Sequence, residues 1–261
     1  MLNHTFRVFK VRFYSLFSTI NRSPIIILGN QKSGTSVITH LIADYGGLTK
    51  TVDIPESWWP TLEMLLDGTL PLKDFARKYS FYFSRDVIKE PNLTFLFDQL
   101  SRIHPGAKFV FVIRDPRSNI RSLLNRISVP GNLPRMDEDE VHAIPADWRP
   151  VFDAALWDLP DGNYVDILAR RWVRAARVYL DHQDRIHLVR YEDFNADKLQ
   201  TIEKLAQKLG VSSKRDITDQ LDVQFQPKGN KSISWEVFFE ENMERIEDIC
   251  SREMAELGYV N

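Results

Sequence analysis

Phosphate binding is the first chemistry that the sequence suggests, because suitable residue types gather between positions 29 and 36. This segment, GNQKSGTS, holds two glycines, one lysine and three hydroxyl side chains. A short apolar run precedes it at 25–28, and apolar residues recur at helical spacing from 37 to 42. A strand, a glycine turn and a helix in this order point free backbone N–H groups at an anion. The candidate ligands are Gln31, Lys32, Ser33, Gly34, Thr35 and Ser36.

The position of the lysine limits which phosphate chemistry is possible. Gly29 and Gly34 have the spacing of a Walker A loop, which continues with Lys and then Ser or Thr. Here Thr35 stands at the lysine position, and the only lysine, Lys32, lies inside the loop. Lys32 could therefore reach the bridging oxygen of a phosphate-linked leaving group. The alternative is that the glycines only close a tight turn between strand and helix.

Two further cations are predicted at the ends of strands. Residues 86–89 are interpreted as a short strand that ends at Lys89, and the apolar strand 108–113 runs directly into Arg114. Ligand groups in open parallel sheets gather at the carboxyl ends of the strands. We therefore expect Lys32, Lys89 and Arg114 to converge on one edge of the sheet.

The helix predicted after Arg114 offers a second contact to the same anion. Ser122 follows Arg114 by eight residues and falls near the second turn of that helix. Arg114 and Ser122 could grip one phosphate together. Arg117 and Arg121 are expected to be exposed.

The alternation of apolar strands with helical patterns predicts an α/β fold with a central, mostly parallel sheet flanked by helices. The length of 261 residues suits a single domain, placed at 24–261. The proline-broken segment 128–163 is interpreted as an insertion or lid that carries acceptor specificity. A late basic loop could fold over a bound anion or be a plain surface turn; it consists of Lys228, Gly229, Asn230 and Lys231.

Composition excludes several classes of protein. A net charge of −2 is not that of a nucleic-acid polycation, and one cysteine, Cys250, excludes an internal disulfide framework. No stretch approaches the roughly 20 apolar residues of a membrane span, and a cytoplasmic location is expected. The histidines lack the spacing of metal ligands, so no metal site is predicted.

Residues 1–23 form a basic extension with Arg7, Lys10, Arg12 and Arg22 and no acidic residue. Phenylalanines interleave with the basic residues at roughly helical spacing. The extension could be a targeting peptide for an organelle or an interfacial helix. An extra helix or strand packed on the domain is slightly favoured, because the apolar run is short and interrupted.

Together these motifs resemble the sulfotransferases that use 3′-phosphoadenosine 5′-phosphosulfate (PAPS). The 31–36 segment is similar to their 5′-phosphosulfate loop, and Arg114 with Ser122 is similar to their 3′-phosphate motif. Weaker likenesses are HLVRYEDF at 187–194 and KGNKSISW at 228–235. The resemblance covers about residues 24–258. It implies a P-loop NTPase-like three-layer sandwich and transfer of a sulfuryl group from PAPS to a hydroxyl or amine, leaving adenosine 3′,5′-bisphosphate (PAP), without a metal.

Two departures from the family pattern concern the loop and the general base. Gln31 stands where Pro or Arg is more usual, and the Lys-Thr-His pattern of the cytosolic small-molecule branch is absent. The chain is closer to the bacterial and carbohydrate-modifying branches, where a glutamate serves as base. Glu56, 24 residues after Lys32 and just before Trp58 and Trp59, fits that role, and Glu90 is the second candidate. The tryptophans could line a substrate pocket or pack at the start of helix 61–66.

The resemblance assigns provisional roles to the candidate residues. Lys32 would stabilise the leaving phosphate, Lys89 would sit beside the transferred group, and the acceptor would be a carbohydrate or small molecule, with no nucleic-acid partner. Two alternatives remain open at this stage. One is an ATP-dependent small-molecule kinase, against which the missing lysine at position 35 counts. The other is a non-catalytic module that binds PAP.

Overall fold

A single five-stranded parallel sheet forms the centre of the computed structural model, which describes residues 2–223 and 233–259. The predicted basic loop at 228–231 lies outside the described residues. The strand order is β2-β3-β1-β4-β5, and every neighbouring pair is parallel. This confirms the predicted α/β class. The strands are β1 (Ile25–Leu28), β2 (Lys50–Val52), β3 (Val87–Lys89), β4 (Lys108–Ile113) and β5 (Ile186–Arg190).

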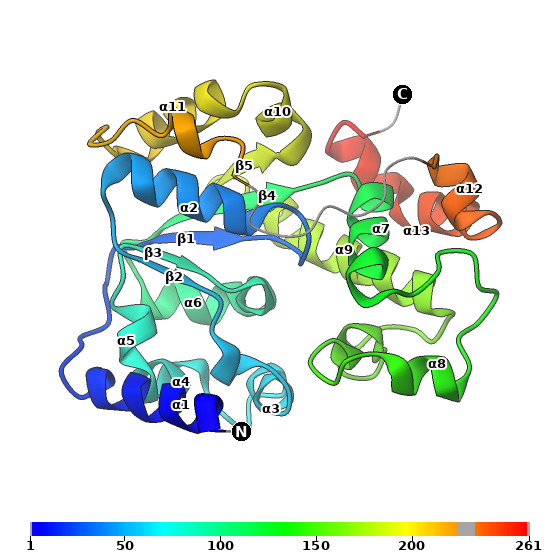
Figure 1. The fold of residues 1–261 in the computed structure, drawn as a ribbon, viewed down its shortest axis with the longest axis horizontal. Coiled ribbons are helices and arrows are strands. Elements are labelled where there is room, and N and C mark those ends of the chain that lie inside the picture. The colour runs from blue at the N-terminus through cyan, green and yellow to red at the C-terminus, as the bar shows by residue number, and fades with distance from the viewer. Residues whose placement is uncertain (1, 224–232, 260–261) are drawn as a thin grey trace.

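Helices cover both faces of the sheet, giving three layers (Figure 1). The helices α2 (Thr35–Gly46) and α11 (Lys198–Leu209) pack on one face, and α6 (Phe97–Ile103) and α9 (Tyr164–Leu180) on the other. Successive strand residues point to opposite faces. Ile27 of β1 accordingly joins the core under α2, whereas Ile26 and Leu28 join the core under α9.

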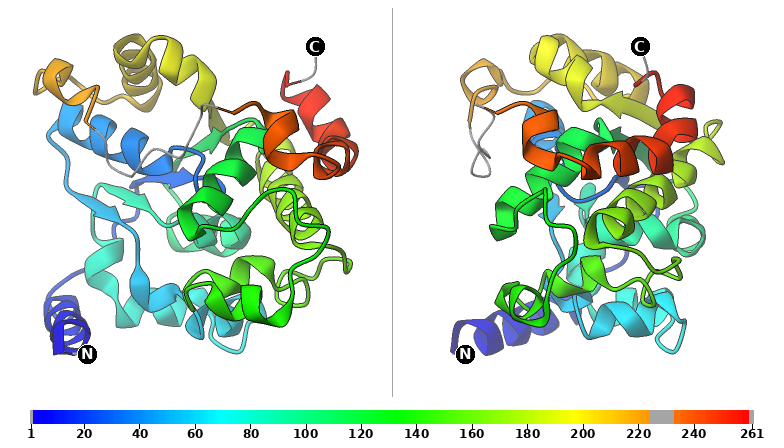
Figure 2. Two further views of the ribbon diagram at one scale, coloured as in Figure 1. Left: turned by 45° about the vertical axis from the view of Figure 1, so that its right-hand side comes forward. Right: turned by 90° about the vertical axis from the view of Figure 1, so that its right-hand side faces the viewer.

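The remaining helices surround this sandwich (Figure 2). They are α1 (Leu2–Ser15), α3 (Thr61–Leu66), α4 (Leu72–Lys78), α5 (Ser80–Phe83), α7 (Pro116–Ile127), α8 (Glu138–Ala143), α10 (Tyr191–Ala196), α12 (Trp235–Phe239) and α13 (Asn242–Glu256), with 3₁₀ turns η1 (Pro55–Ser57), η2 (Pro91–Leu96), η3 (Arg149–Phe152) and η4 (Thr218–Gln220). The bounds of α3 agree with the predicted helix 61–66. Helices α4 and α5 are separated at Tyr79, whose φ of −121° and ψ of 39° are not helical.

A side-chain cap fixes the start of α7 beside the end of β4. Asp115 caps α7 by accepting from the N–H groups of Arg117 at 2.9 Å and Ser118 at 3.4 Å. Pro116 at the first helical position presets the backbone. The chain therefore turns into α7 immediately after Arg114, which keeps this arginine at the carboxyl edge of the sheet.

Residues 128–163 add α8 and η3 and contribute no strand to the sheet. Trp157 is fully buried within this segment, and Trp148 is half-buried. The segment is thus packed against the domain through aromatic side chains.

Candidate functional site

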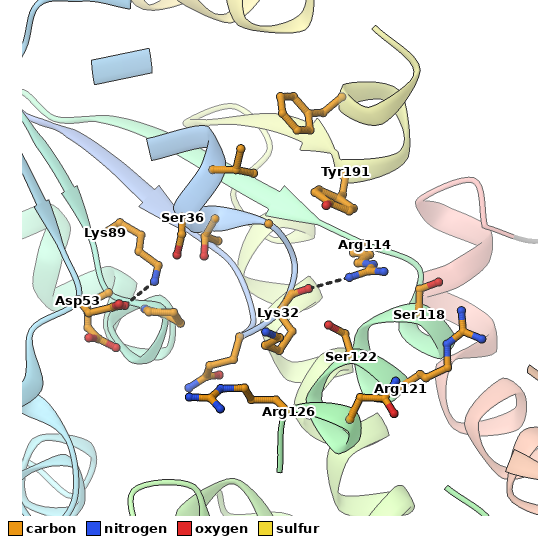
Figure 3. Close-up of a pocket in the computed structure, with 18 of the residues that line it drawn as sticks. Lys32, Ser36, Asp53, Lys89, Arg114, Ser118, Arg121, Ser122, Arg126 and Tyr191 are labelled. Carbon is orange, nitrogen blue, oxygen red and sulfur yellow. Dashed lines mark hydrogen bonds and ion pairs between the residues drawn. The ribbon is translucent and has the colours of Figure 1, made fainter. Parts of the chain in front are cut away.

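A cavity of about 850 Å³ opens at the carboxyl ends of β1, β3 and β4. We call it the central cavity; Figure 3 shows part of its lining. Lys32, Lys89, Arg114 and Ser122 all line it, although they come from distant parts of the sequence. The expected convergence of three cations on one sheet edge is therefore present in the structure.

The loop that carries Lys32 depends on left-handed backbone. Lys32 has a φ of 68°, and Gly34, which caps the start of α2, has a φ of 96°. A Cβ atom at Gly34 would lie 2.3 Å from the Tyr191 ring. Gly34 is thus required both for its conformation and for close contact with Tyr191. The result is a concave turn at the start of a helix, where the first N–H groups have no intrahelical acceptor.

Asn119 of α7 fixes this loop from one side. Its Nδ2 donates to the Gln31 carbonyl at 2.8 Å and to Ser33 Oγ at 3.0 Å, and its Oδ1 accepts from Asn30 Nδ2 at 3.0 Å. All of Asn30, Ser33 and Asn119 are buried. Buried amide networks of this kind are rigid when every member is paired.

Arg171 of α9 is a second support for this loop, and it is fully buried. Its guanidinium donates to Asn30 Oδ1 and Gln31 Oε1, and Gln31 Nε2 donates to Asn92 Oδ1 at 2.8 Å. The guanidinium also lies over the Trp157 ring at 4.4 Å. Burial lowers the pKa of Arg171, with a smaller contribution from the nearby charge of Arg174.

Arg114 contacts the same loop directly. Its Nη1 donates to the Lys32 carbonyl at 3.2 Å (Figure 3), and its guanidinium lies over the Tyr191 ring, 4.9 Å from the centroid. The Arg114 carbonyl accepts from Trp172 Nε1 at 2.9 Å. Burial lowers the pKa of Arg114. The guanidinium is therefore held by aromatic and backbone contacts while still lining the cavity.

Lys32 lies in a strongly positive environment. Burial lowers the pKa of Lys32 most, and together with the charges of Arg126, Arg114 and Lys89, in that order, it brings this pKa to about 8. An anion in the cavity would relieve this repulsion. The electrostatics thus favour a ligand with several negative charges.

Asp53 is a carboxylate that lines the central cavity and pairs with Lys89, and sequence reasoning gave it no role. It follows the short edge strand β2, which was not predicted either. Its φ of 65° turns the side chain into the central cavity, where its Oδ1 forms an ion pair with Lys89 Nζ (Figure 3). The Lys89 side chain is only 4% exposed, whereas that of Asp53 is 38% exposed.

Glu90 also lines the central cavity but is buried and already bonded. Its Oε2 accepts from the Ile54 N–H at 2.9 Å and from Trp58 Nε1 at 3.0 Å, and its Oε1 accepts from the Asn92 N–H at 3.1 Å. Burial raises the pKa of Glu90, against the opposing effect of Lys89. These bonds make Glu90 a support for the segments that flank the cavity.

Glu56 is not among the residues that line the central cavity. Its Oε1 lies 3.3 Å from Arg7 Nε of α1, and its side chain is 4% exposed. Its carboxylate also contributes to a raised pKa of Tyr82, after burial. The structure thus does not bring Glu56 to the other predicted site residues. Trp58 lines the central cavity, whereas Trp59 lines a second cavity of about 910 Å³.

The arginines of α7 differ from expectation. Arg121 was expected to be exposed but is half-buried and lines the central cavity, with its Nη1 donating to the Ile233 carbonyl at 3.0 Å. Arg117 pairs with Asp115 at 2.5 Å and Glu247 at 3.0 Å and lies outside the lining. The α7 residues that line the cavity are Ser118, Arg121, Ser122 and Asn125, and their helical spacing could have indicated this face.

In residues 2–223 and 233–259, no group of three or more His, Cys, Asp or Glu residues is arranged to hold a metal ion. None of the described helices is both long enough and apolar enough to cross a membrane.

Comparison with known proteins gives one family match. The model of the sulfotransferase family matches residues 72–215, which is more than half of the chain. No curated protein matches this sequence.

Solved structures show the same fold at low sequence identity. A sulfotransferase from Mycobacterium avium is 11% identical with a TM-score of 0.58, covering 93% of this chain and 78% of that one. A mouse sulfotransferase complexed with PAP is 11% identical with a TM-score of 0.53, covering 94% and 89%. A sulfotransferase domain from the curacin biosynthetic pathway is 16% identical with a TM-score of 0.51, covering 93% and 99%.

Proposed function

Because this chain belongs to the sulfotransferase family, we propose that it moves a sulfuryl group from PAPS to a hydroxyl or amine of a carbohydrate or small-molecule acceptor. The observation that carries the proposal is the convergence of Lys32, Lys89 and Arg114 on one cavity, beside a phosphate loop without a Walker lysine. Folds alone do not determine function, but this charge arrangement suits a polyanionic nucleotide.

The residues at the loop fit a 5′-phosphosulfate. Any side chain at position 34 would fill the space beside Tyr191, so the loop keeps its backbone accessible. Thr35 and Ser36 add hydroxyls at the start of α2, next to Lys32. When bound, PAPS supplies the sulfuryl group. The presence of PAP in the mouse relative supports this choice of nucleotide.

Lys32 would contact the 5′-phosphosulfate of the nucleotide, and Arg114 would contact its 3′-phosphate. Lys32 places its ammonium inside the loop, where it can stabilise charge that develops on the bridging oxygen. Arg114, with Ser122 and the neighbouring Arg121, would hold the 3′-phosphate and so discriminate against ATP. We call Lys32, Thr35, Ser36, Arg114 and Ser122 the donor end of the cavity.

For the general base we propose Asp53, in place of Glu56 or Glu90. Asp53 lines the cavity and is the most exposed of the three carboxylates. Lys89 bonds to its Oδ1, so its Oδ2 can face an acceptor. Glu56 instead pairs with Arg7, and both oxygens of Glu90 accept hydrogen bonds from groups that frame the cavity.

Acceptor binding is assigned to the same side of the cavity as Asp53. Trp58 follows η1, and Trp148 and Val151 come from the 128–163 segment; all three line the cavity. Aromatic faces suit stacking on a sugar or a ring. We call Asp53, Trp58, Trp148 and Val151 the acceptor end, and propose that the 128–163 segment supplies acceptor specificity.

The first test is a thermal-shift titration with PAP, against ADP plus Mg²⁺, on the wild type and Arg114→Ala. Arg117→Ala is the matched control, because Arg117 lies three residues further along the chain, at the start of α7, and outside the cavity lining. Ligand at about a hundred times its dissociation constant should add about 2.7 kcal/mol of stability. The proposal expects a shift with PAP that Arg114→Ala loses and Arg117→Ala keeps.

Two other outcomes would favour a different function. A shift with ADP and Mg²⁺ but not with PAP would favour a kinase. PAP binding without transfer of sulfuryl groups to a panel of carbohydrate and phenolic acceptors would favour a non-catalytic module.

A further inference from the structure

The outward face of α1 carries a row of apolar side chains to which sulfuryl transfer assigns no role. Phe9 is 70% exposed, Phe13 50%, Leu16 78% and Phe17 77%. The turn continues past the end of α1, because the N–H groups of Leu16 and Phe17 donate to the carbonyls of Phe13 and Tyr14 at 3.2 and 3.1 Å. At 3.6 residues per turn these four positions share one face. We call them the α1 stripe.

The opposite face of α1 is fixed to the domain, so the stripe must point outward. Val11 is buried in the core. Ser15 Oγ accepts from the Phe81 N–H at 3.1 Å, and the Ser15 carbonyl accepts from Ser80 Oγ at 2.8 Å. Figures 1 and 2 show α1 at the outer edge of the molecule, far from the sheet.

Basic residues lie on both sides of the stripe. Lys10 and Arg12 are exposed and flank it around the helix. Residues 1–23 contain no Asp or Glu. Tyr14 of α1 stacks on Phe81, and the Arg85 guanidinium lies 4.1 Å from the centroid of the Phe81 ring. The positive charge therefore extends from α1 to the segment that follows α5.

We propose that the α1 stripe docks this protein on an anionic lipid membrane. Apolar side chains flanked by long basic ones are the pattern of helices that lie in a membrane interface, where the basic ends reach the headgroups. Charge complementarity favours this occupant over a second copy of the chain. A two-fold contact through the stripe would place Lys10 and Arg12 of both copies near one another.

The test is co-sedimentation of the full chain with phosphatidylcholine vesicles, prepared with and without phosphatidylglycerol. The first variant combines Phe9→Ala, Phe13→Ala, Leu16→Ala and Phe17→Ala. The second combines Lys10→Glu and Arg12→Glu. The matched control combines Met64→Ala and Val237→Ala, which remove exposed apolar side chains elsewhere (45% and 62% exposed).

The wild type and the control should bind phosphatidylglycerol vesicles, and added salt should weaken the binding. Each stripe variant should lose at least about tenfold in partition coefficient, with its melting temperature and PAP binding retained. Failure of the wild type to bind, or binding by both stripe variants as strong as that of the wild type, would overturn the proposal. So would a dimer, detected by light scattering, that the alanine variant abolishes while vesicle binding is absent. Because vesicle binding is read without substrate, the result is separate from that of the PAP titration.

Discussion

The donor and acceptor ends of the central cavity are built in different ways. At the donor end, the loop is held from two sides by the buried amides of Asn119 and by Arg171, and it leads directly into α2. At the acceptor end, Asp53 and Trp58 lie between regular elements, and Trp148 belongs to an irregular segment. The donor end, proposed to bind the nucleotide, is thus held by buried hydrogen bonds, whereas the acceptor end is made of loops, which is the usual place for specificity to vary.

The largest expected effect is at the donor end. Lys32→Ala should lower kcat by about 10² to 10³, because it removes a preorganised charge from the site of developing negative charge. Lys198→Ala is the control, since Lys198 also lines the cavity but pairs with Asp222. Steady-state sulfuryl-transfer kinetics measure both variants. A loss below about tenfold for Lys32→Ala would mean that the donor end only binds.

The second-largest effect tests which carboxylate is the general base at the acceptor end. Asp53→Asn should lower kcat by about 10² or more while PAP affinity is kept, because an amide cannot accept the proton. Glu56→Gln should leave turnover nearly unchanged and lower the melting temperature, since it weakens the ion pair between the buried Glu56 carboxylate and the partly exposed Arg7. If the loss instead appears in Glu56→Gln, the original prediction of Glu56 as base is correct.

A loss of activity at alkaline pH should arise at the donor end. The pKa of Lys32 is lowered to about 8, so Lys32 loses its charge, and with it anion binding, as pH rises through that value. The donor kcat/KM should therefore fall by about tenfold per unit above pH 8. Lys32→Arg should remove this decline, because an arginine stays protonated. An unchanged decline in Lys32→Arg would assign the titration to another group.

The smallest effect is expected at the acceptor end. Trp148→Ala should raise the acceptor KM by about two- to tenfold, since aromatic contacts are typically worth about 0.5–1.5 kcal/mol. The donor KM should not change. Trp59→Ala is the control, because Trp59 does not line the central cavity. Equal effects of Trp148→Ala on both KM values would show that the two ends are not separable.

The same division explains what could be predicted from the sequence. The donor end follows from local patterns: an apolar strand, a glycine turn, and a cation just past β3 or β4. These patterns place Lys32, Lys89 and Arg114 without knowledge of the tertiary structure, because parallel strands align their carboxyl ends.

The acceptor end depends on contacts that sequence spacing does not encode. β2 is a three-residue edge strand, which is too short to show the alternating hydrophobic pattern of a strand. The turn at Asp53 that follows it was therefore not predicted. Glu56 lies three residues further, where η1 points its side chain toward Arg7 of α1. The distance of a carboxylate from Lys32 along the chain is therefore a poor guide to its distance in space.

The buried guanidinium of Arg171 restricts which residues positions 31 and 92 can accept. Gln31 both accepts from Arg171 and donates to Asn92, which gives this glutamine a structural role. A proline at position 31 would remove an acceptor from Arg171, and an arginine there would oppose its charge. Because an unsatisfied buried polar group costs about 1–3 kcal/mol, positions 31, 92 and 171 are expected to be inherited as a set. Within the family, a buried arginine at 171 should therefore mark a lineage with its own version of the nucleotide loop.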